Sequence, residues 1–424
     1  MLSTTSVPKF SAAEAAKTQE TQPAEPEHVH EREPFTLDTC LNLLDDTVFR
    51  TPVLLLLPVL LYFYDRQVAP TGLPASLSHV KDLVFKKYKW IGLLLVIGLV
   101  KSANYHLNRL CANNSSYAAD KPDWNRDVVV VTGGANGIGK AIVEVLSHKR
   151  KAKVAVLDLA PPRYAPAPAG APAIQYYRTD VSSPEQVKAA AEQIRATLGE
   201  PTIIVNNAGI ASGQTILACD LSHVERVWRI NHLANYVTLQ EFLPYIVKRN
   251  HGHIVTMASS ASFFSLPSMS EYSTSKTATL ALHEVLKGEL RERYFAPRVR
   301  ATIVAPTKVR TALGDGMEDH ELPFLHPVLD PYQVGRRVLE AVDSGLSQYL
   351  VLPRLMQPLP GLRGFPDWLR RGFELIGKTD QMVCDKSMKR ALKNGYGANW
   401  EGKDAEQRQK VLDRLMKDQG GASA

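Results

Sequence analysis

From Val128 onward, short runs of apolar residues alternate with longer helical segments, and this alternation constrains the fold of the chain more than any other feature. Helical patterns span, for example, Gly137 to His148 and Ser183 to Leu198. Nearly continuous apolar strands joined by helical crossovers are typical of a parallel sheet covered on both faces. The sequence therefore predicts an α/β domain with a doubly wound parallel sheet and helices on both faces. The strand-like runs are residues 128–132, 153–158, 202–207, 253–257 and 299–304.

Two apolar segments precede this domain and do not follow its pattern. They span residues 52–64 and 90–100, and each is shorter than the roughly 20 helical residues that cross a bilayer core, although flanking residues could extend both. Pro58 is expected to kink the first helix. Two short helices favour a hairpin that dips into one leaflet, or an interfacial anchor. Two short spanning helices are one alternative, and a pair of buried core helices is another.

The residues around these segments bear on topology. The linker between them is basic, so if both segments cross a membrane, the positive-inside rule puts the linker in the cytosol and the α/β domain in the lumen. A dipping hairpin instead keeps the domain in the cytosol. The glycosylation sequons at Asn113 and Asn114 would be used only in the lumenal arrangement. The basic residues of the linker are Arg66, Lys81, Lys86, Lys87 and Lys89.

Composition narrows the class of protein. The 424 residues carry a net charge of +7, and the pI is about 9.0, which suits nucleic acid or a membrane surface. Basic residues flank the apolar segments and no nucleic-acid motif is present, so a membrane is favoured and no nucleic acid is expected. Since no two cysteines form a CxxC pair, we expect free thiols and a reducing compartment, without a disulfide framework or a metal site. The cysteines are Cys40, Cys111, Cys219 and Cys384.

Four regions are expected along the chain. Residues 1–35 are polar and rich in Ala, Glu, Thr and Pro, which predicts a disordered N-terminus rather than a signal peptide. Residues 36–110 form the membrane-anchor region, and residues 120–352 form the α/β domain. Residues 353–424 form a basic C-terminal extension. Its partly amphipathic stretch, 359–378, is expected to lie on a membrane, cover a substrate cleft, or pack as an ordinary terminal helix.

The loop after the first predicted strand suits a dinucleotide. In TGGANGIG (132–139), glycines let the backbone approach a pyrophosphate, and the helix that follows offers free N–H groups at its N-terminus. Asp158 lies at the end of the second strand, where a carboxylate binds ribose hydroxyls and repels a 2′-phosphate. Nothing basic immediately follows it, so NAD(H) is preferred over NADP(H). The alternative is that Asp158 only caps the next turn.

A second group of residues suits proton transfer. Tyr272 and Lys276 lie four residues apart, on one face of a predicted helix, and an ammonium beside a phenol lowers the phenol pKa. Ser259 lies just past a strand, where its hydroxyl could hydrogen-bond a substrate oxygen. Asn231 falls inside a long predicted helix, where Asn is a poor residue; a side chain that reaches a buried water or backbone carbonyl would explain it, and an exposed Asn is the alternative. The rivals of Ser259 are Ser260 and Ser262.

Together these residues resemble the pattern of the short-chain dehydrogenase/reductase family, over roughly residues 126–352. One departure is Pro306-Thr307, where the family often has Pro-Gly; it makes the loop less permissive but leaves the position of Thr311 intact. The resemblance implies a Rossmann-type domain. The motifs that carry it are TGGANGIG (132–139), TDV (179–181), NNAG (206–209), Asn231, Ser259, Tyr272, Lys276 and PTKVRT (306–311).

The resemblance also implies a role for each catalytic residue. Tyr272 is expected to be the general acid/base, and Ser259 to orient the reacting oxygen. Lys276 is expected to hold the nicotinamide ribose and lower the pKa of Tyr272. Asn231 is expected to hold the water that links Lys276 to solvent.

Cofactor contacts follow from the same resemblance. Asp180 is expected to face the adenine, and Asn207 to lie near the adenosine ribose and steady the sheet. Val309 and Thr311 are expected to contact the carboxamide end of the cofactor. The full expected set is Gly133, Asn136, Gly137, Ile138, Gly139, Asp158, Asp180, Val181, Asn207, Ala208, Gly209, Tyr272, Lys276, Val309 and Thr311.

With its apolar anchor, the chain is most similar to the membrane-anchored branch of retinol dehydrogenases and 17β-hydroxysteroid dehydrogenases. That similarity implies an NAD-dependent oxidoreductase that interconverts a lipophilic alcohol (retinoid, steroid or fatty alcohol) and its carbonyl. It also implies a homodimer at endoplasmic reticulum or lipid-droplet membranes, with the catalytic domain in the cytosol. An NADPH-dependent lipid ketone reductase and a non-catalytic membrane scaffold are the alternatives. Residues 312–330 fall where the family places its variable substrate loop.

Overall fold

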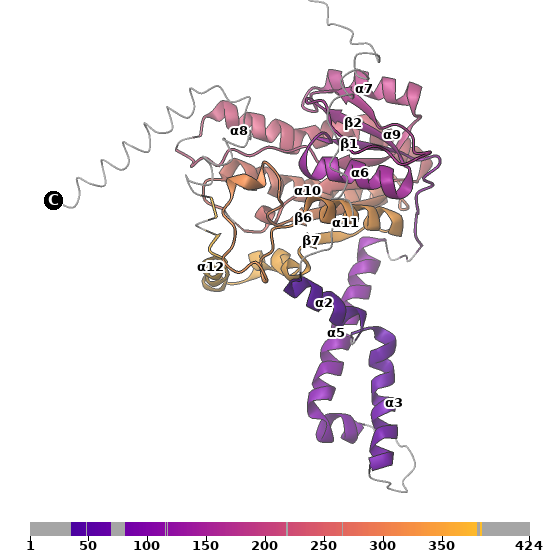
Figure 1. Cartoon of the computed structure of the whole chain (residues 1–424), viewed down its shortest axis with the longest axis vertical. Helices are drawn as coiled ribbons and strands as arrows, with labels where there is room; N and C mark the ends of the chain where they lie inside the picture. The colour runs from indigo at the N-terminus through magenta and orange to yellow at the C-terminus, as the bar shows by residue number, and fades with distance from the viewer. Residues whose placement is uncertain are drawn as a thin grey trace, which may run out of the picture.

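The computed structural model describes residues 35–47, 49–68, 81–114, 116, 118–217, 219–264, 266–379 and 382–383. Its larger part is an α/β domain, and a helical hairpin from the N-terminal region extends from one side of that domain (Figure 1). The predicted disordered N-terminus lies outside the described residues, apart from Phe35. So does the charged end of the C-terminal extension, beyond Val383.

Seven parallel strands form one sheet in the order β3-β2-β1-β4-β5-β6-β7, which confirms the predicted doubly wound, Rossmann-type fold. Five of the strands were predicted. The sequence did not reveal β3 and β7, because each has only four residues and the side chains of β3 are at most half-buried. The strands are β1 Val128–Thr132, β2 Lys153–Asp158, β3 Gln175–Arg178, β4 Pro201–Asn206, β5 His253–Met257, β6 Arg300–Pro306 and β7 Tyr349–Leu352.

Helices cover both faces of the sheet because successive side chains of a strand point to opposite sides. Val129 and Val131 pack with α6 and α11 on one face, and Val128 and Val130 pack with α7, α9 and α10 on the other. A short π-helical turn, η3, joins α8 to α9. These helices are α6 Gly137–Arg150, α7 Pro184–Thr197, α8 Leu221–Trp228, η3 Arg229–Leu233, α9 Ala234–Arg249, α10 Ser270–Glu292 and α11 Pro331–Ser344.

The two N-terminal apolar segments form helices α3 and α5, which pack side by side. Leu54, Val84 and Leu95 form their small apolar core, and a Cβ on Gly98 would lie 2.7 Å from a Leu54 methyl carbon. Most of their other large side chains are exposed, so the pair of buried core helices is wrong. These exposed residues include Leu55, Leu56, Leu60, Phe63, Trp90, Leu93, Ile97 and Val100.

Flanking residues lengthen both helices beyond their apolar segments. The first, α3 Thr51–Val68, continues past Pro58, and the second, α5 Lys89–Ala112, has 24 residues. Among the described helices, α5 alone is long and apolar enough to cross a membrane. A short π-helix, η2 Leu83–Lys87, precedes α5.

A further helix, α2 Leu37–Asp46, ties the hairpin to the α/β domain. Asp45 pairs with Lys101 of α5 and with Arg354 in the C-terminal extension. Asp38 accepts hydrogen bonds from the backbone N–H groups of Arg354 and Leu355, at 2.9 and 2.7 Å. The hairpin is therefore attached beside the start of the extension.

The sequon asparagines lie at the end of α5, where the chain enters the domain. Asn113 is fully buried; its Nδ2 donates to the Ser347 carbonyl at 3.2 Å, and its Oδ1 accepts from the Ser347 N–H at 2.7 Å. Asn114 Nδ2 donates to the Pro297 carbonyl at 2.9 Å. Both side-chain amides, the atoms that a glycan would modify, are engaged by the domain.

The described part of the C-terminal extension consists of short helices. The last of them, α12, exposes its large side chains: Trp368 is 75% exposed and Ile376 is 79% exposed. An ordinary packed terminal helix is therefore not what α12 forms. These helices are η6 Arg354–Met356, η7 Leu359–Gly364 and α12 Asp367–Ile376. Two 3-10 turns, η4 Ser260–Ser262 and η5 Gly314–Gly316, follow β5 and β6.

Candidate active site

The loop between β1 and α6 closes tightly because of its glycines. Gly133 and Gly137 have φ angles of +63° and +56°, a region that glycine adopts without steric cost. A Cβ on Gly139 would lie 2.1 Å from the Gly133 carbonyl oxygen, so only glycine fits where α6 begins against the loop. The predicted tight turn is therefore present.

The N-terminus of α6 offers donors at this loop. Its N-cap, Asn136, makes no side-chain hydrogen bond to the helix. The first N–H groups of a helix have no intrahelical acceptor, and the helix dipole favours an anion there. Thr311 lies beside the same turn, since a Cβ on Gly137 would be 3.2 Å from its methyl carbon. This donor set, in a cradle that side chains would fill, fits the pyrophosphate of a dinucleotide.

Asn207 fastens the loop after β4 to the glycine loop. Its Nδ2 donates to the carbonyls of Thr132 and Gly133, both at 3.0 Å. The Thr132 hydroxyl accepts from the backbone N–H groups of Asn207 and Ala208, at 3.0 and 3.1 Å. Asn207 therefore steadies this edge of the sheet.

The carboxylate of Asp158 lies at the end of β2 and faces the glycine loop. It accepts from the backbone N–H of Ala135 at 2.9 Å and from that of Ala160 at 3.0 Å. The second bond is the turn cap that the sequence left as an alternative. Tyr164, whose hydroxyl donates to the Gly134 carbonyl at 2.9 Å, lies nearby; its pKa is raised by burial and by the charge of Asp158. Asp180, after β3, accepts from the N–H and hydroxyl of Ser182.

Tyr272 and Lys276 share one face of α10, as their spacing predicted. The Lys276 ammonium lies 5.9 Å from the centre of the Tyr272 ring and donates to the Met257 carbonyl at 2.8 Å. Burial lowers the pKa of Lys276 to about 8. Burial raises the pKa of Tyr272, and a hydrogen bond with Ser259 lowers it. In this structure burial opposes the downward shift that the sequence predicted for the phenol.

Three serines competed for the role beside the tyrosine. Of the three, Ser259 is the one that lowers the pKa of Tyr272, and its hydroxyl accepts from the Ala261 N–H at 3.2 Å. Ser260 and Ser262 instead form the buried η4 turn that follows. The geometry brings Ser259 to Tyr272.

Asn231 sits in the π-helical turn η3, and its side chain is buried at 1% exposure, so the exposed alternative is wrong. Its Oδ1 accepts from the Ile210 N–H at 2.8 Å, and its Nδ2 donates to the Ile210 carbonyl at 2.9 Å. A Cβ on Gly209 would lie 3.3 Å from Lys276 Nζ and 3.4 Å from Asn231 Oδ1. The NNAG loop thus passes closely against both side chains. Single π turns inside helices are frequent at functional sites.

Sequence reasoning missed Glu271, the residue before Tyr272. Its side chain is buried, and it accepts hydrogen bonds from both the N–H and the hydroxyl of Ser212. Ser212 follows the same loop that Asn231 holds at Ile210. A Glu that precedes a Tyr has no periodic signal, so only the folded chain could reveal this second attachment of the loop.

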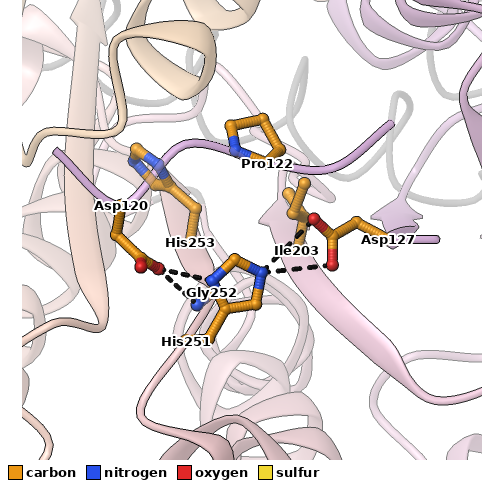
Figure 2. Close-up of a pocket in the computed structure, with 7 residues that line it drawn as sticks. All are labelled: Asp120, Pro122, Asp127, Ile203, His251, Gly252 and His253. Carbon is orange, nitrogen blue, oxygen red and sulfur yellow. Dashed lines mark hydrogen bonds and ion pairs between the residues drawn. The ribbon is translucent and has the colours of Figure 1, made fainter. Parts of the chain in front are cut away.

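A different polar cluster lies at the opposite edge of the sheet, where β4 and β5 begin (Figure 2). His251 joins Asp120 through Nδ1 at 2.7 Å and Asp127 through Nε2 at 3.2 Å. Arg298 pairs with Asp120 at 2.8 Å. These groups tie the segment that follows α5 to the domain, far from Tyr272.

Metal-ligating residues are dispersed in the described ranges, where no three His, Cys, Asp or Glu side chains group together as a metal site would require. Cys40, Cys111 and Cys219 are free thiols. Cys384 lies outside the described residues.

Comparisons with known proteins find a family match and several related dehydrogenases. The family model of the short chain dehydrogenases matches residues 127–322. Dehydrogenase RED2 of Cochliobolus heterostrophus is 39% identical over 211 residues, which cover 50% of this chain and 78% of the relative. Epidermal retinol dehydrogenase 2 of Mus musculus is 30% identical, covering 54% of this chain and 75% of the relative. Estradiol 17-beta-dehydrogenase 11 of Pongo abelii is 31% identical, covering 51% and 71%.

Proposed function

The chain belongs to the short-chain dehydrogenase family, and from this premise we propose that it interconverts a lipophilic alcohol and its carbonyl with NAD(H), using Tyr272 as general acid/base. The family match and the dehydrogenase relatives establish an oxidoreductase that acts on CH–OH groups. They set aside a non-catalytic scaffold. The observation that carries the finer proposal is the buried Tyr272 with the Lys276 ammonium 5.9 Å from its ring, together with Ser259, which lowers its pKa.

The side chains supply the proton chemistry. Bound nicotinamide would accept the carbinol hydride in oxidation and supply it in reduction. Tyr272, as phenolate, takes the proton of the alcohol and returns it in the reverse direction. Ser259 hydrogen-bonds the substrate oxygen and holds it beside the phenol. Proton transfer by a positioned group contributes roughly 10² to 10⁴ in rate.

Lys276 and Asn231 support that transfer. With a pKa of about 8, Lys276 stays mostly protonated at neutral pH, so its charge favours the phenolate against the burial that opposes it. Asn231 holds the loop at Ile210 and, by resemblance to the family, a water between Lys276 and solvent. Glu271 holds the next part of the loop at Ser212.

Asp158 supports NAD(H) over NADP(H). Its carboxylate lies at the end of β2 beside the glycine loop, where ribose hydroxyls would be bound and a 2′-phosphate repelled. One observation favours the alternative, an NADPH-dependent ketone reductase. Arg178 lies opposite Asp158 in the pairing of β2 with β3, and its side chain is exposed. A basic group there could accommodate a 2′-phosphate.

The hairpin of α3 and α5 supports a location at the membrane of the endoplasmic reticulum or at lipid droplets. It also supports a lipophilic substrate. The 24 residues of α5 and the exposed apolar side chains of both helices suit a hydrocarbon environment. The fully buried amide of Asn113, which is hydrogen-bonded to Ser347, leaves no room for a glycan there, and this favours the cytosolic arrangement of the domain. We also propose that the protein forms a homodimer and that the chain consists of the four regions predicted from the sequence.

The first test is cofactor binding by the full chain in lipid nanodiscs, with NADH and NADPH titrated in parallel by fluorescence. We expect tighter binding of NADH, and Asp158→Ala should reduce the preference. Tighter binding of NADPH would overturn the role given to Asp158 and favour the ketone reductase. Oxidation of 1-dodecanol, all-trans-retinol and 17β-estradiol with NAD then tests the substrate class.

A further inference from the structure

Apolar side chains from four separate segments meet around Tyr272. Ala211 follows β4; Ala261, Leu266 and Met269 follow β5; and Met317 follows β6. The fourth segment is the C-terminal extension, whose Val383 is buried in the same cluster at 7% exposure. Met382 packs against the cluster, as do Phe264 and Leu313.

The first three segments are loops at the carboxyl ends of parallel strands, where open α/β sheets bind their ligands. The fourth comes from outside the region that the family model matches, which ends at residue 322. Tyr272 itself is only 8% exposed, so the extension helps to shield the phenol from water. Its position is therefore a property of this chain rather than of the matched domain.

Two further contacts hold the extension on the substrate-loop segment. The Glu318 N–H donates to the Met382 carbonyl at 2.7 Å. Lys378 pairs with Glu321 at 2.6 Å. Thr379, between them in sequence, is buried at 8% exposure. The extension is thus attached to the segment that follows Met317.

We propose that Met382 and Val383 form part of the wall of the substrate site, and that the wall accommodates a flexible alkyl chain attached to the reacting carbon. The proposal rests on the function proposed above. The cluster's apolar members are small or aliphatic side chains and Met, together with Phe264 and the ring of Tyr272. Met269, Met317 and Met382 have unbranched, rotatable side chains that adapt to irregular apolar shapes. Such a wall suits a fatty alcohol better than a rigid steroid.

The experiment measures the affinity of the full-length protein, in nanodiscs, for 1-dodecanol. Affinity is measured with NADH bound, by the fluorescence of the cofactor, and without cofactor, by calorimetry. We expect Val383→Trp to weaken 1-dodecanol binding about tenfold or more, since overpacking a filled apolar site is unfavourable. NADH affinity should change by less than about twofold. The matched control is Leu375→Trp, because Leu375 is 59% exposed on α12 of the same extension.

Several outcomes decide the matter. Equal affinity of wild type and Val383→Trp for 1-dodecanol would overturn the wall, and so would equal losses in Val383→Trp and Leu375→Trp. Tighter binding of 17β-estradiol than of 1-dodecanol would overturn the chain preference. If the wild-type protein did not bind NADH, the proposed function would be wrong. The calorimetric affinities for 1-dodecanol, measured without cofactor, would still test whether Val383 lines the substrate site.

Discussion

The two edges of the sheet carry two buried polar clusters with opposite character. At the amino edge, His251 lies between Asp120 and Asp127 (Figure 2), and Asp120 also pairs with Arg298. At the carboxyl edge, the charge of Lys276 is buried against the neutral Met257 carbonyl. Buried charges are therefore paired with opposite charges where the chain enters the domain, whereas Lys276, beside Tyr272, is held by a neutral backbone carbonyl.

This difference teaches what each edge is for. A buried ionic cluster is destabilised strongly by the loss of one partner, so the amino edge holds the fold together. Burial without a countercharge displaces pKa values, which is how a protein prepares groups for proton transfer. We therefore expect substitutions at the amino edge to change stability, and substitutions at the carboxyl edge to change activity.

The largest expected effect is on activity. Tyr272→Phe removes the hydroxyl proposed to transfer the proton and should lower kcat by roughly 10² to 10⁴. NADH affinity and the thermal unfolding midpoint should stay near those of wild type. The control is Tyr294→Phe, at an exposed tyrosine just beyond the C-terminal end of α10, and this variant should turn over normally. Full turnover by Tyr272→Phe would end the acid/base assignment.

The next effect is on stability at the amino edge. Asp120→Ala leaves His251 and Arg298 without a shared carboxylate and should lower the free energy of unfolding by about 3 kcal/mol or more. The values of kcat and KM should not change in the folded protein. Asp123→Ala is the control, since that carboxylate is half exposed. If kcat fell as steeply as stability, the two edges would not be separate.

A smaller effect of opposite sign is expected at the carboxyl edge. Burial lowers the pKa of Lys276 from 10.5 to about 8, which corresponds to a cost of about 3 kcal/mol for the charged amine. Lys276→Met removes that cost but also the bond to the Met257 carbonyl, so we expect a net gain of about 1 kcal/mol in unfolding free energy near pH 7. Activity should be lost.

The pH dependence of that gain follows from linkage. Below pH 8 the amine is protonated in both the folded and the unfolded chain, and the full cost is present. Between pH 8 and 10.5 only the unfolded chain holds the proton, so wild-type stability rises with pH and the advantage of Lys276→Met shrinks. Denaturant unfolding at pH 7 and at higher pH measures this, with Lys188→Met as an exposed control. A constant difference across pH would contradict it.

The smallest effect sharpens the amino-edge comparison. Arg298→Ala should cost less than about 1 kcal/mol, because the Arg298 side chain is 65% exposed and water replaces much of the pair. A double-mutant cycle with Asp120→Ala isolates the pair. A loss as large as that of Asp120→Ala would mean that Arg298, rather than His251, holds the cluster.

Much of the fold was predictable because its signal is local. The apolar run Val128–Thr132 predicts a buried strand, and the glycines that follow it predict a tight turn, all within a dozen residues. β3 and β7 escaped prediction because each contributes only four residues, and QYYR lacks a continuous apolar run. The two N-terminal apolar segments were recognised from the sequence. Only the structure showed how far the helices α3 and α5 extend into the flanking residues.

Part of the candidate site could also be predicted from local sequence, and part could not. The spacing of Tyr272 and Lys276 placed them on one helix face, because helical periodicity relates residues four apart. Nothing local separated Ser259 from its neighbours, since all three serines offer the same hydroxyl. The structure separates them, because Ser260 and Ser262 are part of the buried turn η4, whereas Ser259 precedes it.

The sequence by itself determined the parallel sheet, the glycine loop and the helix that carries Tyr272, because periodicity and backbone permissiveness belong to contiguous residues. Only the tertiary structure decided that Val383 joins the apolar cluster that contains Tyr272, that Asn113 is hydrogen-bonded to Ser347, and that His251 meets Asp120. Each of these contacts joins residues more than a hundred positions apart. An apolar pattern records that a face is buried, but the residue that buries it is chosen by the packing of the whole chain.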